Sequence, residues 1–241
     1  MLRVTAGFDR RDATSLRDVP PDFMAALDGE VKGLKVAWSS DLGYAVVDQQ
    51  VLSSYFSCLP VFESLGCAVE EKTPNTGEPY SIFGPIALAD AYAAFGHLLD
   101  EHADDLMPYV KSTLEHGRDV AGHEYSQTLR RLERFRMEMA EFFREFDLLL
   151  TPATAVPAFP AGQRPREIDG QKVSPLWGAF PFTVAFNLTR QPAASVPCGF
   201  SPDGLPIGLQ IVGRYGEEAT VLRASAAFEK ARPWADKVPP V

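Results

Sequence analysis

Residues 177–213 read WGAFPFTVAFNLTRQPAASVPCGFSPDGLPIGLQIVG, and the rest of the chain must fit around this stretch. It begins with an aromatic segment of half-buried character that ends in a turn at 189–192. Two β-prone runs follow, at 194–197 and 207–212, separated by a turn that contains Asp-Gly at 203–204. Because Asp-Gly between two such runs is a strong hairpin signal, the stretch predicts a pair of antiparallel strands.

The segment before position 71 has the pattern of a strand, a helix and a second strand. The strands are expected within 31–38 and at 67–70, and Asp48 suits the N-cap of the helix between them. Pro60 lies inside the helical pattern and predicts a kink or a break into two pieces. Strand, helix, strand over this length predicts a parallel βαβ unit.

Helical patterns dominate the middle of the chain. An alanine-rich helix is expected over 82–99, one or two helical turns over 103–116, and the longest helix over 123–146. In the longest helix, apolar residues recur at steps of three and four and predict one buried stripe: Tyr125, Leu129, Leu132, Phe135, Met139, Phe142 and Phe146. It spans barely more than three heptads, which favours a helix packed on the core over a coiled coil.

The last third of the chain completes an α/β pattern. A short, wholly apolar strand is expected at 147–150, a surface loop with five prolines at 151–175, and a final helix at 217–231. These elements predict an α/β fold with a mixed sheet flanked by helices over 31–241. Residues 1–30 are polar and read as an N-terminal approach segment.

The overall composition limits the possible partners. The formal net charge of −9 argues against a nucleic-acid or anionic-membrane surface. No apolar run approaches the length of a membrane span, and residues 1–11 lack the apolar core of a secretory signal. The three cysteines, Cys58, Cys67 and Cys198, have no disulfide-framework spacing, so reduced thiols and a cytoplasmic location are expected.

The candidate nucleophiles lack the surroundings that nucleophilic catalysis needs. The serine pair at 39–40 lies near Lys35, but both belong to one strand without flanking glycine, so a strand-ending role is favoured. The pair at 53–54 lies within a predicted helix. Ser195 lacks a strand-turn-helix elbow, and Cys198 has no histidine nearby in the sequence. None of them is therefore expected to be a nucleophile: a solvated helix face is favoured for the pair at 53–54, and a packing or backbone-bonding role for Ser195 and Cys198.

The sequence predicts neither a metal site nor a cofactor. The four histidines, His97, His102, His116 and His123, have no ligand spacing. The His-Glu pair at 123 begins like a zinc-binding helix, but no histidine follows four positions later. No GxGxxG or Walker sequence is present.

The order of these blocks resembles the amidase-signature family. NLTRQPAASVPCGFSPDGLPIGLQIVG at 187–213 is similar to the C-terminal core of those enzymes. LKVAWSSDLGYAVVD at 34–48 and FDLLLTPATAVPAFP at 146–160 are similar to two further blocks in family order. AGFDRRDATS at 6–15 resembles the segment that follows the nucleophile-bearing region. The resemblance covers nearly the whole chain but only the C-terminal portion of the family.

The resemblance implies a mechanism in which a serine attacks an amide. The family, which includes amidases and the amidating subunits of glutamyl-tRNA amidotransferases, uses a bridging serine in a cis peptide and a neutral lysine, with oxyanion-binding backbone N–H groups in a Gly/Ser-rich loop. No such loop or lysine block occurs in these 241 residues. We therefore expect the C-terminal portion of a carboxamide hydrolase, without a catalytic residue of its own and inactive alone.

Four residues are candidates for contacting a substrate: Trp177, Phe180, Phe182 and Asn187. Three aromatic side chains and one amide suit a wall of an amide pocket, because such pockets are apolar with few placed polar groups. Core packing for the aromatics and a backbone-bonding role for the asparagine are the alternative. The resemblance implies that the amidotransferase members carry an acid near Phe180 to hold glutamine, so a phenylalanine favours a stand-alone amidase.

A second interpretation is a truncated, non-catalytic homologue that serves as a binding or assembly module. Such a module would close an exposed apolar face by forming a homodimer. In the first interpretation the same face would associate with the N-terminal half of the enzyme. The complete enzyme would then act on a small amide. Neither interpretation involves nucleic acid or a membrane.

Overall fold

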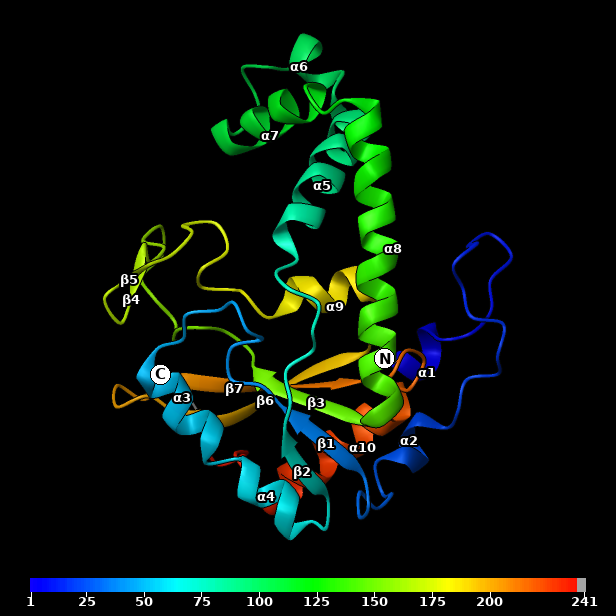
Figure 1. The fold of residues 1–241 in the computed structure, drawn as a ribbon, viewed down its shortest axis with the longest axis vertical. Coiled ribbons are helices and arrows are strands. Elements are labelled where there is room, and N and C mark those ends of the chain that lie inside the picture. Colours follow the sequence, from blue (N-terminus) through cyan, green and yellow to red (C-terminus); the bar gives the residue numbers. More distant parts are fainter. Residues whose placement is uncertain (238–241) are drawn as a thin grey trace.

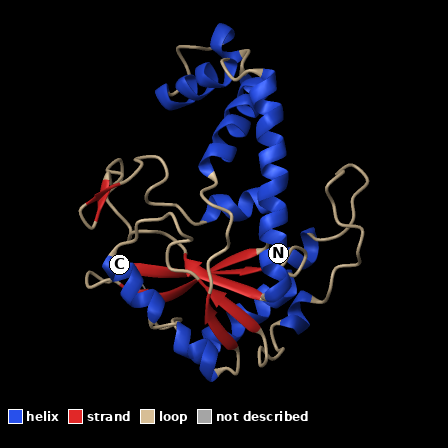
Figure 2. Ribbon diagram, viewed as in Figure 1, coloured by secondary structure: helices blue, strands red, loops and turns tan. Residues whose placement is uncertain are grey.

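A five-stranded sheet forms the centre of the computed structural model, which describes residues 1–237 (Figure 2). Its strands are β1 Lys35–Trp38, β2 Ala68–Glu71, β3 Leu148–Pro152, β6 Ala193–Phe200 and β7 Pro206–Gly213, in the spatial order β2-β1-β3-β7-β6. β1 pairs in parallel with β2 and β3, and β7 pairs antiparallel with β3 and β6. The predicted mixed sheet, its parallel βαβ unit and its C-terminal hairpin are confirmed.

Helices and a small hairpin surround this sheet. The helices of the described residues are α1 Leu2–Thr5, α2 Phe23–Ala26, α3 Gln49–Phe56, α4 Leu59–Ser64, α5 Tyr80–Phe95, α6 Leu98–Glu101, α7 Pro108–Arg118, α8 Gly122–Glu145, α9 Thr183–Thr189 and α10 Glu218–Ala231. A two-residue hairpin pairs β4 Glu167–Ile168 with β5 Gln171–Lys172. Figure 1 shows α5, α6, α7 and α8 extending as an arm away from the sheet.

Both faces of β3, the middle strand of the sheet, are buried. Leu148, Leu149 and Leu150 are each 0% exposed. A strand covered on both faces is expected to be a continuous apolar run, as this one is. The Asp147 carboxylate just before β3 accepts the N–H of Lys35 at the start of β1 at 2.8 Å. This contact joins two segments that are far apart in the sequence.

The first face of the sheet is covered by α3, α4 and α10. Asp48 caps α3 by accepting the N–H of Gln50 at 2.7 Å, as predicted. The expected break at Pro60 is also present, because α3 ends at Phe56 and α4 begins at Leu59. The rings of Phe62 in α4 and Phe228 in α10 stack with centroids 5.4 Å apart and join the two helices over the sheet. Both rings are fully buried.

The second face is covered by α9 and by the sheet-proximal part of the arm. α8 matches the predicted helix within one residue at each end. Leu132, Phe135 and Met139 are buried as predicted, but Leu129 is 39% exposed and Thr128 is buried in its place. The prediction for Leu129 is wrong because this end of α8 packs on α5 rather than on the sheet, which changes the line of contact.

Three other predicted elements differ from the structure. The first helix of the arm, α5, starts two residues earlier than expected and ends at Phe95, four residues earlier than expected and before the short α6. The expected one or two turns at 103–116 are the 11-residue helix α7. The proline-rich loop at 151–175 contains the β4–β5 hairpin. The predicted final helix is confirmed within one residue, and the strand that became β3 starts one residue later and ends two residues later than expected.

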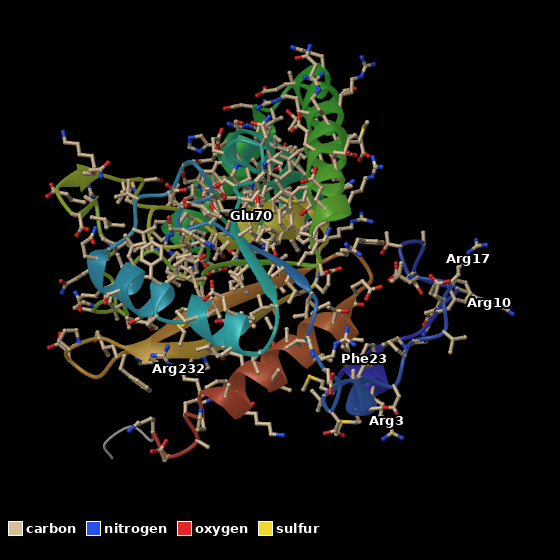
Figure 3. The ribbon with its side chains drawn as sticks, turned by 60° about the horizontal axis from the view of Figure 1, so that its bottom comes forward. Arg3, Arg10, Arg17, Phe23, Glu70 and Arg232 are labelled. Atoms are coloured by element: carbon tan, nitrogen blue, oxygen red, sulfur yellow. The ribbon has the colours of Figure 1, made fainter. Side chains whose placement is uncertain are left out.

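The N-terminal segment lies beside α10. Phe23, the first residue of α2, is buried, while most other residues of this segment are exposed. Figure 3 shows Arg3, Arg10 and Arg17 along this segment, away from the sheet. The boundary between residues 30 and 31 stays a prediction. Within residues 1–237, no helix has both the length and the apolarity that crossing a bilayer requires.

Candidate functional site

A row of polar side chains crosses the second face of the sheet. Strand register places Ser195 of β6 beside Gln210 of β7, and Gln210 beside Thr151 of β3. The Gln210 amide is 5% exposed, and its Nε2 donates to the Thr151 hydroxyl at 2.9 Å and to the Phe182 carbonyl at 3.3 Å. Gln210 therefore ties two strands to the residue that precedes α9.

This contact has a positional consequence for the loop before α9. Phe182 is the N-cap residue of α9, and Trp177 and Phe180 lie just ahead of it. Because buried hydrogen bonds of an amide fix both groups that they join, Gln210 holds the end of that loop on the sheet. Sequence reasoning assigned no role to Gln210. The available signal was an amide side chain within an otherwise apolar strand.

α9 presents one polar edge and is otherwise buried. Val184, Phe186 and Leu188 are buried, whereas Thr183 and Asn187, one helical turn apart, are exposed. The helix stops at Arg190, whose φ of 64° is left-handed. Its N–H still donates to the Phe186 carbonyl at 2.7 Å. Asn187 therefore stands on the side of this helix that faces away from the core.

Aromatic rings gather around Trp177. Its indole stacks on Tyr80 with centroids 5.5 Å apart and meets the edge of Phe83 at 5.3 Å. Tyr44 meets Tyr80 edge-on at 6.2 Å, and its hydroxyl donates to the Pro181 carbonyl at 3.0 Å. These rings belong to segments far apart in the sequence, so Tyr44 and Tyr80 could not be recognised as neighbours of Trp177 from the sequence.

A cavity of about 200 Å³ lies among Tyr44, Tyr80 and Trp177, with Lys172 and Ser174 also on its wall. The Tyr80 hydroxyl is buried and finds no hydrogen-bond partner within residues 1–237. Burial raises the pKa of Tyr80 to about 12, so the hydroxyl keeps its proton at neutral pH. It is therefore an available hydrogen-bond donor beside an apolar ring.

The structure separates the four predicted substrate-binding residues. Of the four, Trp177 alone lines this cavity. Phe180 is 37% exposed and lies near Phe159 with centroids 6.0 Å apart. Phe182 is 0% exposed within the main core, and Asn187 is on the exposed edge of α9. Their common assignment to a substrate pocket stays a prediction.

The residues that superficially resemble a catalytic group lie apart. Lys35 and Ser39 are four residues apart along β1 and the residue after it, a separation of about 13 Å in extended chain. The buried Ser39 hydroxyl contacts the Thr73 hydroxyl at 2.8 Å and accepts the Leu42 N–H at 3.0 Å, as expected of a strand-ending residue. Every lysine of the chain is exposed or half-buried.

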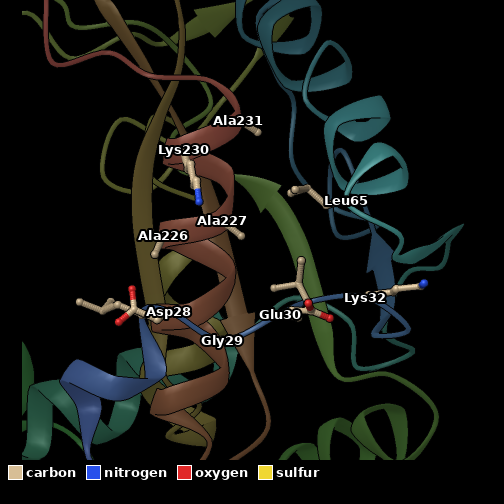
Figure 4. Close-up of a pocket in the computed structure, with 11 residues that line it drawn as sticks. Asp28, Gly29, Glu30, Lys32, Leu65, Ala226, Ala227, Lys230 and Ala231 are labelled. Carbon is tan, nitrogen blue, oxygen red and sulfur yellow. The ribbon is translucent and has the colours of Figure 1, made fainter.

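A second hollow, of about 670 Å³, lies beside α10 (Figure 4). Residues 28–32, Leu65 and the side of α10 that carries Ala226 and Lys230 form its wall. Acidic and basic side chains are mixed there, and none of the four predicted residues takes part. Within residues 1–237, no three His, Cys, Asp or Glu side chains gather in a way that could hold a metal ion.

Comparisons with known proteins agree with this architecture. The sequence model of the Amidase family matches residues 1–222. An acylamidase from Rhodococcus erythropolis is 34% identical over 246 residues, which cover 99% of this chain and 51% of that protein. A glutamyl-tRNA(Gln) amidotransferase subunit from Syntrophomonas wolfei is 32% identical over 257 residues, which cover 95% of this chain and 51% of that protein.

Solved structures give the same result. The crystal structure of a bacterial aryl acylamidase of the amidase-signature family matches with a TM-score of 0.84 at 31% identity, covering 96% of this chain and 50% of that one. The chain thus spans about half the length of the relatives it matches, consistent with the C-terminal portion expected from the sequence. Since the family's sequence model matches most of the chain and its fold matches as well, the chain belongs to the amidase-signature family.

Proposed function

We propose that this chain forms the C-terminal half of an enzyme that hydrolyses a small carboxamide to a carboxylate and ammonia or an amine through an acyl-serine. Its role is to supply five strands, the flanking helices and part of the substrate pocket. The attacking serine, the bridging serine and the lysine belong to residues outside this chain. The isolated 241-residue chain is therefore inactive.

One observation carries this proposal: relatives match almost the whole chain, yet the chain covers only about half of each relative. The positions of the polar groups support it. A lysine that accepts a proton must be held neutral, which burial favours. Each lysine of the chain is instead at least partly exposed, and Lys35 lies at the other end of β1 from Ser39.

The free edge of β6 supports association with another part of the enzyme. The Pro192 carbonyl accepts the Gly213 N–H at 2.9 Å. Because backbone groups alternate in direction along an antiparallel strand, those of Ala193 and Ser195 point away from β7. β6 is an edge strand of the described sheet, so these groups are available to pair with a further strand.

The substrate wall we propose consists of Trp177, Phe180 and Asn187, with Tyr44 beside Trp177, whereas Phe182 is enclosed in the core and does not contact the substrate. An acidic side chain near Phe180 would favour an amino-group-bearing substrate such as glutamine. Phenylalanine, 37% exposed, favours instead an amide without that charge. The first proposal is thus a stand-alone amidase rather than part of an amidotransferase.

Reconstitution tests this function. The chain would be assayed alone and after co-expression with the N-terminal half of the Rhodococcus erythropolis acylamidase, against a chromogenic aryl acylamide, an aliphatic amide and glutamine. The expected result is no turnover alone and turnover of an amide by the pair. Turnover by the chain alone, retained through several purification steps, would contradict the proposal. Copurification of the two halves is measured first, because the assay of the pair reports on chemistry only when they are associated.

A matched pair of phenylalanine variants then locates the pocket. Phe180 and Phe200 are exposed to similar extents, 37% and 42%. In the reconstituted enzyme, Phe180→Ala should raise KM several-fold, because it removes apolar contact with the substrate. Phe200→Ala at the end of β6 should leave KM unchanged. Equal kinetics for the two variants would remove Phe180 from the pocket.

A specific feature of the arm favours a second candidate, a binding or assembly module that forms a homodimer. α5 is apolar on all sides, which normally indicates a buried helix, yet only Ile82 in it is buried and Phe95 is 56% exposed. Light scattering on the chain alone tests this candidate. Phe95→Glu should dissociate such a dimer, whereas Met137→Glu, 71% exposed on α8, should not. A monomeric parent chain would count against the module.

A further inference from the structure

Two of the three cysteines are in contact across the first face of the sheet. Cys58 lies between α3 and α4, Cys198 lies in β6, and they are 0% and 1% exposed. The Cys58 Sγ lies 3.6 Å from the Cys198 carbonyl oxygen, and each thiol shifts the pKa of the other. Sequence reasoning treated both cysteines as isolated thiols, because 140 residues separate them.

An irregularity in β6 creates this contact. The β6–β7 register shifts between Pro197 and Gly199, which leaves Cys198 without a partner residue in β7. A bulge of this kind re-aims a side chain, here toward α3. Gly199 then allows a close approach, because a Cβ at that position would lie 2.7 Å from the Ser54 hydroxyl. Strand and helix together bring the Cys58 sulfur against the backbone of Cys198.

A guanidinium group completes the cluster. Arg232, which follows α10, places Nη1 3.5 Å from the Cys58 Sγ and 2.8 Å from the Ser57 hydroxyl. Figure 3 shows Arg232 near this part of the sheet. The neighbouring Cys198 thiol and the charge of Arg232 lower the pKa of the Cys58 thiol. The same contact and burial raise the pKa of Cys198. Of the pair, Cys58 is thus the better nucleophile.

Cys67 provides an internal contrast. Among the described residues, its Sγ makes a hydrogen bond only to the Val31 carbonyl, at 3.3 Å. Burial raises the pKa of this thiol. It is also 8% exposed, slightly more than either member of the pair. Exposure alone would therefore favour oxidation of Cys67. The contact between Cys58 and Cys198 and the positive charge of Arg232 favour oxidation of Cys58 and Cys198 instead.

We propose that Cys58 and Cys198 are a redox modification site that forms a reversible disulfide in the presence of a hydroperoxide. The Cys58 thiolate attacks a peroxide oxygen, the O–O bond breaks, and the leaving oxygen departs as water after taking up a proton. The Cys198 sulfur then attacks the resulting sulfenic acid and releases a second water. In total, two thiols lose two electrons and two protons, and hydrogen peroxide becomes two waters. This site is independent of the proposed hydrolase function.

Burial determines the rate of this reaction. Neither sulfur is open to solvent, so the reagent must enter during local opening. We expect that opening at the junction of β6 and α3, because β6 is an edge strand and α3 ends one residue before Ser57. The reaction should therefore be slower than oxidation of an exposed thiol and faster in a low concentration of urea that leaves the fold intact.

Mass spectrometry of the full 241-residue chain tests the proposal. The reduced chain is treated with hydrogen peroxide, then denatured and alkylated. We expect a mass about 2 Da lower before alkylation, one alkylated cysteine instead of three, and a non-reduced peptide pair joining Cys58 to Cys198. Dithiothreitol should restore three alkylated cysteines. Cys67→Ser should behave as the parent chain, and Arg232→Gln should oxidise several-fold more slowly with the same connectivity.

Several results would overturn the proposal, and the parent chain alone is enough to obtain them. They are a disulfide that includes Cys67, oxidation of Cys58 to sulfinic acid without pairing, or three intact thiols after a treatment that fully oxidises a small dithiol. Unchanged thiol loss in Cys198→Ser would also contradict it. Circular dichroism confirms that each variant is folded, and Cys198→Ala serves as a second variant if the serine is not tolerated.

Discussion

Replacing Arg214 with methionine should lower the free energy of unfolding by about 2–4 kcal/mol. The Arg214 Nε donates to the carbonyl oxygens of Phe143 and Phe146, at 2.7 and 3.0 Å, at the C-terminal end of α8. Its Nη2 lies 3.0 Å from the Asp147 carboxylate. One side chain just after β7 therefore binds the end of α8 to the start of β3.

The magnitude follows from these contacts. A hydrogen bond from a charged donor contributes about 1.5–3 kcal/mol. Because a single Nε–H serves both carbonyl oxygens, the two contacts are counted as one hydrogen bond. The ion pair adds less than about 1 kcal/mol, because the Arg214 and Asp147 side chains are 42% and 24% exposed. Methionine keeps most of the aliphatic part of the arginine side chain. The decrease in the free energy of unfolding therefore measures chiefly the contribution of the guanidinium group.

Urea denaturation followed by circular dichroism measures the change, with Arg144→Met as the control. Arg144 lies on α8 near the same end, but it is 75% exposed and contacts only Glu141, at 2.9 Å. The control should lose less than about 0.5 kcal/mol. A loss for Arg214→Met within about 0.5 kcal/mol of the control would refute the reasoning.

Three further predictions concern the arm, the cavity and the core. Gly117→Ala should destabilise the chain by about 1–3 kcal/mol in urea denaturation, because its Cβ would collide with the Leu88 carbonyl, whereas Gly122→Ala should be neutral or stabilising. Burial raises the pKa of Tyr80 from 10.0 to about 12, so stability should be full below pH 10 and fall as the pH rises toward 12, less steeply in Tyr80→Phe. Phe228→Ala should cost about 3–5 kcal/mol in the same assay, since its ring is fully buried; a loss below about 1 kcal/mol would contradict this.

Much of the fold was predictable because its signals are local. Asp48 and Pro60 mark the start and the break of the first large helix in both the sequence and the structure. The Asp-Gly turn at 203–204 joins the predicted hairpin. A second Asp-Gly, at 169–170, joins β4 to β5 and carries the same signal, but the surrounding prolines favoured an irregular loop.

Other features were not predictable because their signals are tertiary. α9 is buried on nearly every side, so Val184 to Leu188 have no amphipathic stripe to announce a helix. Phe182 and Trp177 look alike in sequence, yet the first is in the core and the second lines a cavity. The contacts of Gln210 and of the Cys58–Cys198 pair exist only once distant strands and helices meet.

The position of β3 in the sheet has a consequence for synthesis on the ribosome. Its parallel partner β1 precedes it by 112 residues, as in the pairing of Val36 with Leu148. At a synthesis rate of roughly 5–20 residues per second, about 6–20 s pass between the synthesis of β1 and the synthesis of β3. During that interval the apolar edge that β3 will cover is open, and the nascent chain is most exposed to mispairing. Chaperones that hold unfolded chains would be expected to act in this window, before α8 has emerged completely.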